Sequence, residues 1–103
     1  MSETEGRHAR HGLDDEIHAP VRFSLVAALA EVDEAEFGHV RDTIEVSDSV
    51  LSKQSSRLEA AGYVKIRKGY VGKRPRTWLS LTSAGREAYR RHLEALRAIA
   101  EGT

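Results

Sequence analysis

The chain has 103 residues, which is enough for one compact domain around a single hydrophobic core. Apolar residues make up 40% of it and charged residues 31%, as in soluble globular proteins, and the absence of cysteine excludes disulfides and thiolate metal sites. The formal net charge is zero, but residues 1–52 carry 4 basic and 12 acidic side chains, whereas residues 53–78 carry 8 basic and 1 acidic side chain.

The N-terminus shows no targeting signal. Residues 1–12 are poor in large apolar side chains, so we expect a disordered tail followed by one domain over residues 13–101. No apolar run approaches the ~18 residues of a membrane span, and the apolar centre of a signal peptide is missing. We therefore expect a cytoplasmic protein.

Two helices are predicted in the acidic half of the chain. Three consecutive carboxylates favour a short helix at 13–18, because negative charge complements the positive end of a helix. Pro20 suits the first position of a second helix, at 20–32. The apolar residues that recur there at helical spacing, and that we expect to face the core, are Val21, Leu25, Ala28, Leu29 and Val32.

A helix-turn-helix pattern follows. A very short strand is expected near residue 36, and residues 38–44 read as a third helix. The hydroxyl of Ser47 can cap the next helix, which stabilises it by about 1 kcal/mol. Gly62 readily takes the left-handed conformation that ends a helix, so this fourth helix spans 48–61. Its expected inward residues are Val46, Val50, Leu51, Leu58 and Ala61.

A basic hairpin comes next. Alternating apolar and charged residues predict strands at 64–68 and 76–81, and the turn between them is bracketed by Gly69, Gly72 and Pro75. No acidic residue occurs within this hairpin to balance its cations. The six cations are Lys65, Arg67, Lys68, Lys73, Arg74 and Arg76.

The last predicted element is an amphipathic helix at 83–100, capped by Thr82. Apolar residues form a seam along it at spacings of three and four. A long apolar seam at one end of a small domain favours dimerisation. The seam consists of Tyr89, Leu93, Leu96 and either Ile99 or Ala100.

The helix at 48–61 and the hairpin suggest contact with DNA. The helix exposes hydroxyls and a lysine, which suits entry into the major groove, about 12 Å wide. Cations on a stiff loop suit phosphate contact or minor-groove insertion. The alternatives are an ordinary amphipathic helix with a polar face and an edge hairpin whose cations prevent aggregation. The candidate DNA-binding residues are Ser47, Ser49, Ser52, Lys53, Ser56 and Arg57 in the helix, and Lys68, Lys73, Arg74 and Arg76 in the hairpin.

Signals for catalysis are weak. The sequence contains no P-loop, no dinucleotide-binding glycine pattern and no G-x-S-x-G motif. Its five histidines are scattered, and no two form a close ligand pair on one helix face. We therefore expect no catalytic residue, no metal and no cofactor.

Four motifs resemble small bacterial and archaeal winged-helix transcriptional regulators related to the MarR and ArsR groups. The similarity extends from Leu13 to Leu96. Each motif is modest alone, and together they are specific. The motifs are HAPVR, SDSVLSKQSSRLEAAGYV, GKRPRTW and LTSAGR.

The resemblance implies a homodimer whose two recognition helices, Ser47 to Arg57 in each chain, enter successive major grooves. It also implies that Lys73, Arg74 and Arg76 form the wing. The first helices and the last helix would form the dimer interface, which assigns to it Leu13, Ile17, Tyr89, Leu93 and Leu96.

The chain departs from the family pattern in three respects. Ser55 stands where the family usually has a leucine in the recognition helix. The additional helices that frame a ligand pocket in full-length MarR regulators are missing, and so are the cysteines common in ArsR-type metal sensors. Regulation by an effector is therefore left open.

The sequence thus predicts a mainly helical α+β fold, a winged helix-turn-helix with a two-stranded β wing and a C-terminal dimerisation helix. The predicted function is sequence-specific binding of double-stranded DNA by a homodimeric transcriptional regulator, a repressor rather than an activator. The alternative is a winged-helix module that binds an acidic partner protein through the same cations.

Overall fold

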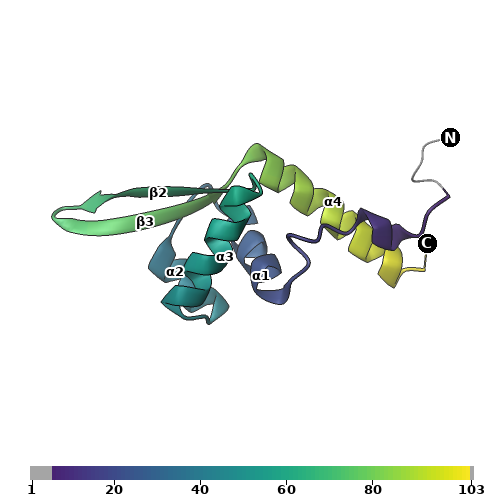
Figure 1. Cartoon of the computed structure of the whole chain (residues 1–103), viewed down its shortest axis with the longest axis horizontal. Coiled ribbons are helices and arrows are strands. Elements are labelled where there is room, and N and C mark those ends of the chain that lie inside the picture. The colour runs from purple at the N-terminus through teal and green to yellow at the C-terminus, as the bar shows by residue number, and fades with distance from the viewer. Residues whose placement is uncertain (1–5, 103) are drawn as a thin grey trace.

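The computed structural model describes residues 6–102 and confirms the predicted fold class. The hairpin projects to one side of the molecule and the last helix to the other, while the remaining α-helices gather between them (Figure 1). The described chain measures 57 × 24 × 20 Å along its principal axes. In chain order its elements are η1 (Ala9–Gly12), α1 (Pro20–Ala30), β1 (Ala35–Glu36), α2 (Phe37–Ile44), α3 (Asp48–Ala60), β2 (Val64–Val71), β3 (Arg74–Leu81) and α4 (Ser83–Ala100).

Helix α1 supplies the centre of the core. Pro20 occupies its first turn, as predicted, but the helix ends at Ala30, and Val32 beyond it is 40% exposed. The buried stripe is also rotated from the predicted one, and the chain before Pro20 contacts α1 through Arg22, which donates to the Glu16 and Asp15 carbonyl oxygens. The buried residues of α1 are Arg22, Leu25, Val26 and Leu29.

Helices α2 and α3 form the predicted helix-turn-helix. The turn passes through Glu45, which takes a left-handed conformation with φ of 58°. The hydroxyl of Ser47 accepts a hydrogen bond from the Val50 N–H at 3.2 Å and caps α3, as predicted. Val50 itself, expected to face inward, is 37% exposed. The buried residues of α3 are instead Leu51, Ser55 and Leu58, which are spaced four and three residues apart and therefore lie on one side of the helix.

The sheet has three antiparallel strands in the order β1-β3-β2. The hairpin strands are longer than predicted, and the turn is confined to Gly72 and Lys73, with Gly72 at φ of +62°. Gly69 and Pro75, predicted to bracket the turn, therefore lie within strands and pair with Arg76 and Tyr70. The longer strands carry the tip of the hairpin well beyond the helices (Figure 1).

The segment before Pro20 differs most from prediction, because residues 13–18 form no helix. The Asp14 carboxylate accepts hydrogen bonds from the N–H groups of Glu16 and Ile17 at 2.9 and 3.3 Å, which makes a local turn that competes with a helix. Within the expected tail, η1 lies against α4, with a Cβ built on Gly12 only 3.2 Å from Ala95. Residues 1–5 of the expected tail lie outside the described residues.

Helix α4 is capped by Thr82, as predicted, whose hydroxyl accepts from the Gly85 N–H at 2.9 Å. A Cβ on Gly85 would lie 2.2 Å from the Tyr63 carbonyl oxygen, so glycine is required where α4 crosses the end of α3. Among residues 6–102, no helix has both the length and the apolar character needed to cross a lipid bilayer.

Candidate nucleic-acid interface

The exposed face of α3 carries the predicted recognition residues. These residues are exposed to solvent, and they are Ser47, Ser49, Ser52, Lys53 and Ser56. The Ser47 hydroxyl is occupied by the cap and lies 3.2 Å from the Ser49 hydroxyl. Within the described chain, the side chains of Ser52, Lys53 and Ser56 make no hydrogen bond and no ion pair, so their donors are available to an external partner.

The wing has two different faces. On its outer face, Arg67 binds Glu34 with nitrogen–oxygen distances of 2.9 and 2.7 Å and lies 4.1 Å above the ring of Trp78. Arg76 lies 3.4 Å from Glu36 on the same face. The hydrogen bond from Arg67 also holds the pKa of Glu34 below its ordinary value. Two of the six hairpin cations are therefore neutralised by residues of the β1 region.

These two ion pairs could not be predicted from the local sequence of the hairpin. Glu34 and Glu36 precede the hairpin by some thirty residues, and only the pairing of β1 with β3 brings them beside it. The cations that remain without an ion pair in the described part of the hairpin are Lys65, Lys68, Lys73 and Arg74.

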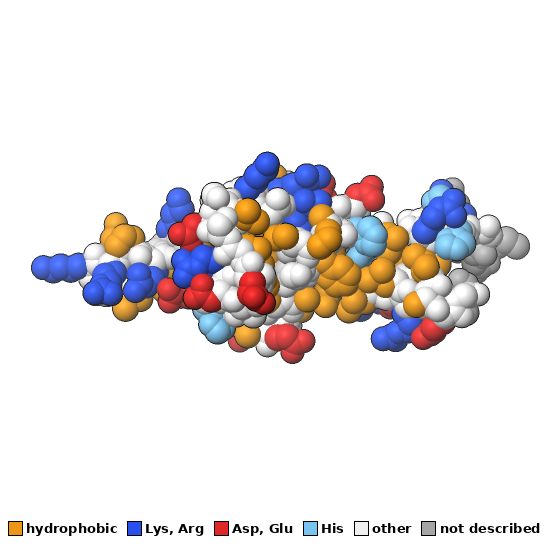
Figure 2. Space-filling model, turned by 90° about the horizontal axis from the view of Figure 1, so that it is seen from below, with side chains coloured by type: hydrophobic (Ala, Val, Ile, Leu, Met, Phe, Trp, Pro, Cys, Tyr) orange, Lys and Arg blue, Asp and Glu red, His pale blue; other side chains and the backbone are white. Residues whose placement is uncertain are grey.

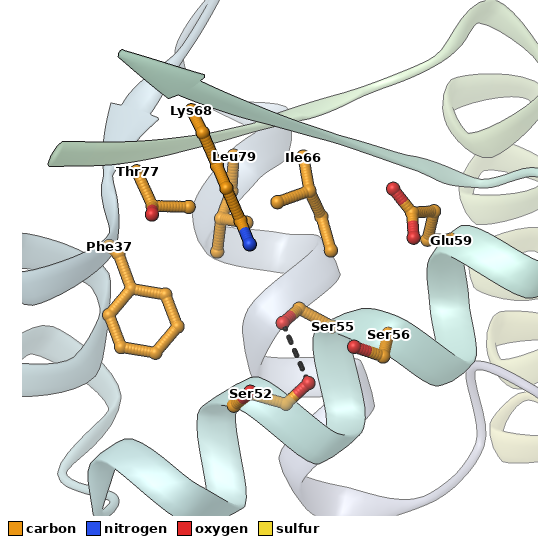
Figure 3. A pocket seen from close by; sticks show the side chains of 9 residues that line it. All are labelled: Phe37, Ser52, Ser55, Ser56, Glu59, Ile66, Lys68, Thr77 and Leu79. Carbon is orange, nitrogen blue, oxygen red and sulfur yellow. Dashed lines mark hydrogen bonds between the residues drawn. The ribbon is translucent and has the colours of Figure 1, made fainter. Parts of the chain in front are cut away.

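The inner face of the wing and α3 enclose a groove of about 670 Å³. Figure 3 shows the Lys68 side chain extending into it from β2, toward the serines of α3. Phe37 and Leu79 form its apolar wall, while Glu59 lies near the end of α3. The groove thus presents one ammonium group beside several hydroxyls. These hydroxyls belong to Ser52, Ser55, Ser56 and Thr77.

Ser55, the departure from the family pattern, lies at the base of this groove. It is 2% exposed, and its hydroxyl donates to the Leu51 carbonyl oxygen at 2.6 Å. The hydroxyl is thus satisfied within its own helix. Leu51 and Leu58 on the same face of α3 are both 0% exposed, so α3 remains packed against the core. The small serine side chain leaves space for the groove.

Arg57 does not join the other predicted recognition residues. Its guanidinium lies 2.9 and 3.5 Å from the carboxylate oxygens of Glu16, and this hydrogen bonding lowers the pKa of Glu16. The side chain is therefore committed to the segment before α1. Arg57 would have to leave Glu16 to contact DNA, so its role there stays a prediction.

The tip of the wing carries Lys73 and Arg74, as predicted. It also carries Tyr70 and Val71, which are 74% and 57% exposed. Because side chains alternate along β2, Tyr70 lies on the inner face and Val71 on the outer face. The tip thus combines two cations with an apolar side chain on each face.

The predicted dimer-interface residues fall into two groups. Ile17 is 0% exposed, so it belongs to the core of a single chain and cannot be an interface contact. Leu13, Tyr89 and Leu96 are partly or largely covered within the chain, and Leu93 is exposed. Figure 2 shows an apolar area between the helical body and the far end of α4, while Lys and Arg side chains occupy the opposite, hairpin end.

The part of the chain that the structure describes contains no group of three or more His, Asp or Glu residues placed to hold a metal ion.

Comparison with known proteins shows three similarities. A family model described as a winged helix DNA-binding domain matches residues 21–100, which include all four α-helices except the first residue of α1. An uncharacterised protein of Methanocaldococcus jannaschii is 26% identical over 73 residues, covering 71% of this chain and 79% of that protein. A transcriptional regulator homologue from Pyrococcus horikoshii OT3, whose structure is known, is 29% identical in sequence. The structural match covers 84% of this chain and 86% of that protein's chain, with a TM-score of 0.79.

A fourth similarity is more distant. A MarR-family transcriptional regulator from Silicibacter pomeroyi is 26% identical with a TM-score of 0.66. The match covers 88% of this chain but 60% of that regulator.

Proposed function

The chain belongs to the family of winged-helix DNA-binding domains, and on that basis we propose that it binds double-stranded DNA sequence-specifically as a transcriptional regulator. One observation supports this most. Lys68 of the wing and the hydroxyls of Ser52 and Ser56 on α3 line one groove, and Lys73 and Arg74 lie at the tip of the same wing, while Glu34 and Glu36 pair with Arg67 and Arg76 on its outer face.

In this proposal, α3 reads base edges in the major groove. Ser49, Ser52 and Ser56 can each donate to or accept from a base edge or a phosphate, and Lys53 can reach a guanine edge or a phosphate. The groove between α3 and the wing then faces the backbone between the major and minor grooves. Lys68 would contact a phosphate there.

The wing tip is proposed to contact the neighbouring minor groove or its backbone. Lys73 and Arg74 provide positive charge on a turn fixed by Gly72. Each phosphate that they neutralise releases a bound counterion, so affinity should fall with rising salt. Arg76 contributes less in this arrangement, because it already has Glu36 as a partner.

We further propose that the protein acts as a homodimer through the apolar seam of α4. Leu93 is 36% exposed and Ile99 is 37% exposed on this helix, and they provide the accessible part of the seam. A dimer would present two α3 helices to two half-sites of a palindromic operator. Repression by occupying the operator follows most simply, since no further surface for recruiting polymerase is required.

The proposal is tested by selecting bound sequences from a pool of randomised duplexes at physiological salt. We expect a two-fold symmetric motif, and a scrambled motif should bind at least tenfold more weakly, a difference of about 1.4 kcal/mol. A pool that remains random after selection would contradict sequence-specific binding.

A protein-interaction module is the alternative, and the exposed Tyr70 and Val71 at the wing tip favour it. Such a module would retain a specific protein partner at salt concentrations that abolish DNA binding. Substituting Tyr70 and Val71 by serine would then remove the partner. The same substitutions would leave the number of counterions released on DNA binding unchanged.

A further inference from the structure

Helices α3 and α4 are joined directly at one end. The Thr82 N–H donates to the Tyr63 carbonyl oxygen at 3.0 Å, and the Thr82 hydroxyl donates to the Gly62 carbonyl oxygen at 2.6 Å. Gly85 packs on the backbone of Tyr63. These contacts fix where the end of α3 meets the start of α4. Helix α4 is also held against α1 and the turn after it, because Arg86 donates to the Ala30 and Val32 carbonyl oxygens at 3.3 and 2.9 Å and the ring of Phe23 meets Tyr89 and His92 edge-on. None of these contacts joins α4 to α3 itself beyond their junction.

Residues 14–16 provide a second connection between the same helices. The Asp14 backbone N–H donates to Nδ1 of His92 on α4 at 2.9 Å. His92 lies seven residues beyond Gly85, about 10 Å along the helix at ~1.5 Å per residue. Two residues after Asp14, the Glu16 carboxylate binds Arg57 of α3 at 2.9 Å. One short segment thus contacts α3 in its last turn and α4 about two and a half turns beyond its start.

A buried arginine of α1, Arg22, also binds the backbone of this segment. Arg22 is 8% exposed, and its Nε donates to the Glu16 carbonyl oxygen at 2.5 Å. Its Nη1 donates to the Gln54 side chain of α3 at 2.9 Å. The segment is therefore bound to α3 both directly and through Arg22.

A last contact closes the arrangement. The Tyr63 hydroxyl donates to the Asp14 carboxylate at 2.6 Å, and Asp14 raises the pKa of that hydroxyl. Tyr63 belongs to the junction of α3 and α4, so the junction, α3 and α4 are all bound to the same three residues. In such a closed arrangement the helices cannot pivot without breaking a hydrogen bond.

We propose that residues 14–16, here called the brace, set the angle between α3 and α4 and thereby the half-site spacing that the dimer accepts. The proposal rests on the proposed function, in which α4 joins the two chains and α3 reads the DNA. A dimer binds half-sites about 34–36 Å apart, so a small change of angle at each α4 would move the two α3 helices out of register. Asp14 and Glu16 are positioning residues, and the brace lies before the region matched by the family.

The first experiment measures the angle without DNA. The chain has no cysteine, so Ser49→Cys on α3 and Arg97→Cys on α4 allow spin labels at two exposed positions. Labelled protein is diluted with unlabelled protein, so that distances within one chain dominate. The brace variant is Glu16→Met with Tyr63→Phe, which removes the acceptor of Arg57 and the donor to Asp14 and leaves the shape nearly unchanged.

We expect one narrow distance distribution for the parent and a broader or shifted one for the brace variant. The matched control is Arg90→Gln, which removes exposed ion pairs to Glu87 and Glu94 on α4 away from the brace, and it should match the parent. Exchanging the charges, with Glu16→Arg and Arg57→Glu, should restore a narrow distribution that either exchange alone broadens. A brace variant with the parent distribution would overturn the proposal.

The second experiment uses DNA. Duplexes carry the two selected half-sites with their spacing changed by one base pair at a time, and unlabelled protein is titrated against each. We expect the parent to discriminate sharply between the best spacing and its neighbours, and the brace variant to lose this discrimination severalfold. A variant that is merely less stable would bind all spacings proportionally more weakly, and that result would overturn the proposal. If the parent binds no duplex specifically, the proposed function fails, whereas the distance measurement still decides whether the brace fixes the angle.

Discussion

Among single residues of the described chain, three buried polar side chains deviate from a simple apolar core, namely Arg22 of α1, Ser55 and His92. Ser55 satisfies its hydroxyl within α3 and leaves space above it. His92 is 0% exposed and accepts the Asp14 N–H through Nδ1, while Nε2 has no hydrogen-bond partner among the described residues. Edge-on aromatic contacts with His18 and Phe23 surround its ring. The environment of His92 and the groove above Ser55 were not evident from the sequence, because both depend on residues distant along the chain.

Ser55→Leu should stabilise the protein. The leucine side chain would extend into the groove between Ile66 and Leu79 and bury apolar surface, for a gain of about 0.5–2 kcal/mol in the free energy of unfolding. Urea unfolding of the variant measures this gain. The control is Ser56→Leu on the exposed neighbour, which should change stability little. A loss of stability in Ser55→Leu would show that the groove is too narrow for the added carbons.

The stability should depend on pH through His92. Burial lowers the pKa of His92 from its ordinary value of 6.5, His18 lowers it further, and Asp14 opposes them. The folded state therefore binds fewer protons than the unfolded state below pH 6.5. The contribution of neutral His92 is complete above pH 6.5 and is lost as pH falls from there through the lowered pKa.

Unfolding free energies measured between pH 7.5 and 5 test this expectation. They should fall with acidity in the parent, and they should fall less steeply in His92→Asn, whose amide oxygen can still accept the Asp14 N–H. Equal slopes for the two proteins would contradict the role of His92.

Among the helices and strands, local sequence patterns predicted most of the secondary structure. Helix caps at Ser47 and Thr82 and the alternation in the hairpin depend on neighbouring residues, so they could be read directly. The conformation of the segment before Pro20 could not be predicted in this way. The Asp14 carboxylate accepts hydrogen bonds from a local turn and from the Tyr63 hydroxyl, and it does not start a helix. The ion pairs of Arg67 and Arg76 on the outer face of the wing could not be predicted either, because they require the pairing of β1 with β3.

Gly85→Ala should weaken the junction of α3 and α4. The new Cβ would lie 2.2 Å from the Tyr63 carbonyl oxygen, so the backbone of one element has to move. We expect a loss of about 3 kcal/mol, at the upper end of the usual cost of overpacking. Thermal or urea unfolding measures it, with Ser83→Ala on the exposed first turn as the control. A loss below about 0.5 kcal/mol, the range typical of surface substitutions, would contradict the close approach.

Across the molecule as a whole, opposite ends have different chemistry. The hairpin end carries unpaired cations, and the α4 end carries an apolar seam (Figure 2). The uneven distribution of charge along the sequence predicted the cations of the hairpin, and helical periodicity predicted the apolar seam of α4. The connection between the two ends through residues 14–16 was beyond prediction, because it brings together residues 41 to 78 positions apart.

If the protein forms the proposed dimer, Leu93→Asp should convert it to monomers, because a buried carboxylate without a partner is costly in an apolar interface. Light scattering measures the mass directly, and the monomers should bind a two-half-site operator poorly. The control is Val50→Asp, since Val50 is 37% exposed compared with 36% for Leu93 but lies on α3. Intact dimers of Leu93→Asp would show that the interface lies elsewhere.

DNA binding through α3 and the wing is tested most directly by the salt dependence of affinity for the selected operator. It is measured for the parent and for Lys73→Ala with Arg74→Ala, with Glu94→Gln as a control at the other end. We predict that the wing variant binds every sequence more weakly. Its slope of log affinity against log salt should be shallower by about 0.9 for each phosphate that the wing no longer neutralises. An unchanged slope in the wing variant would contradict this mode of binding.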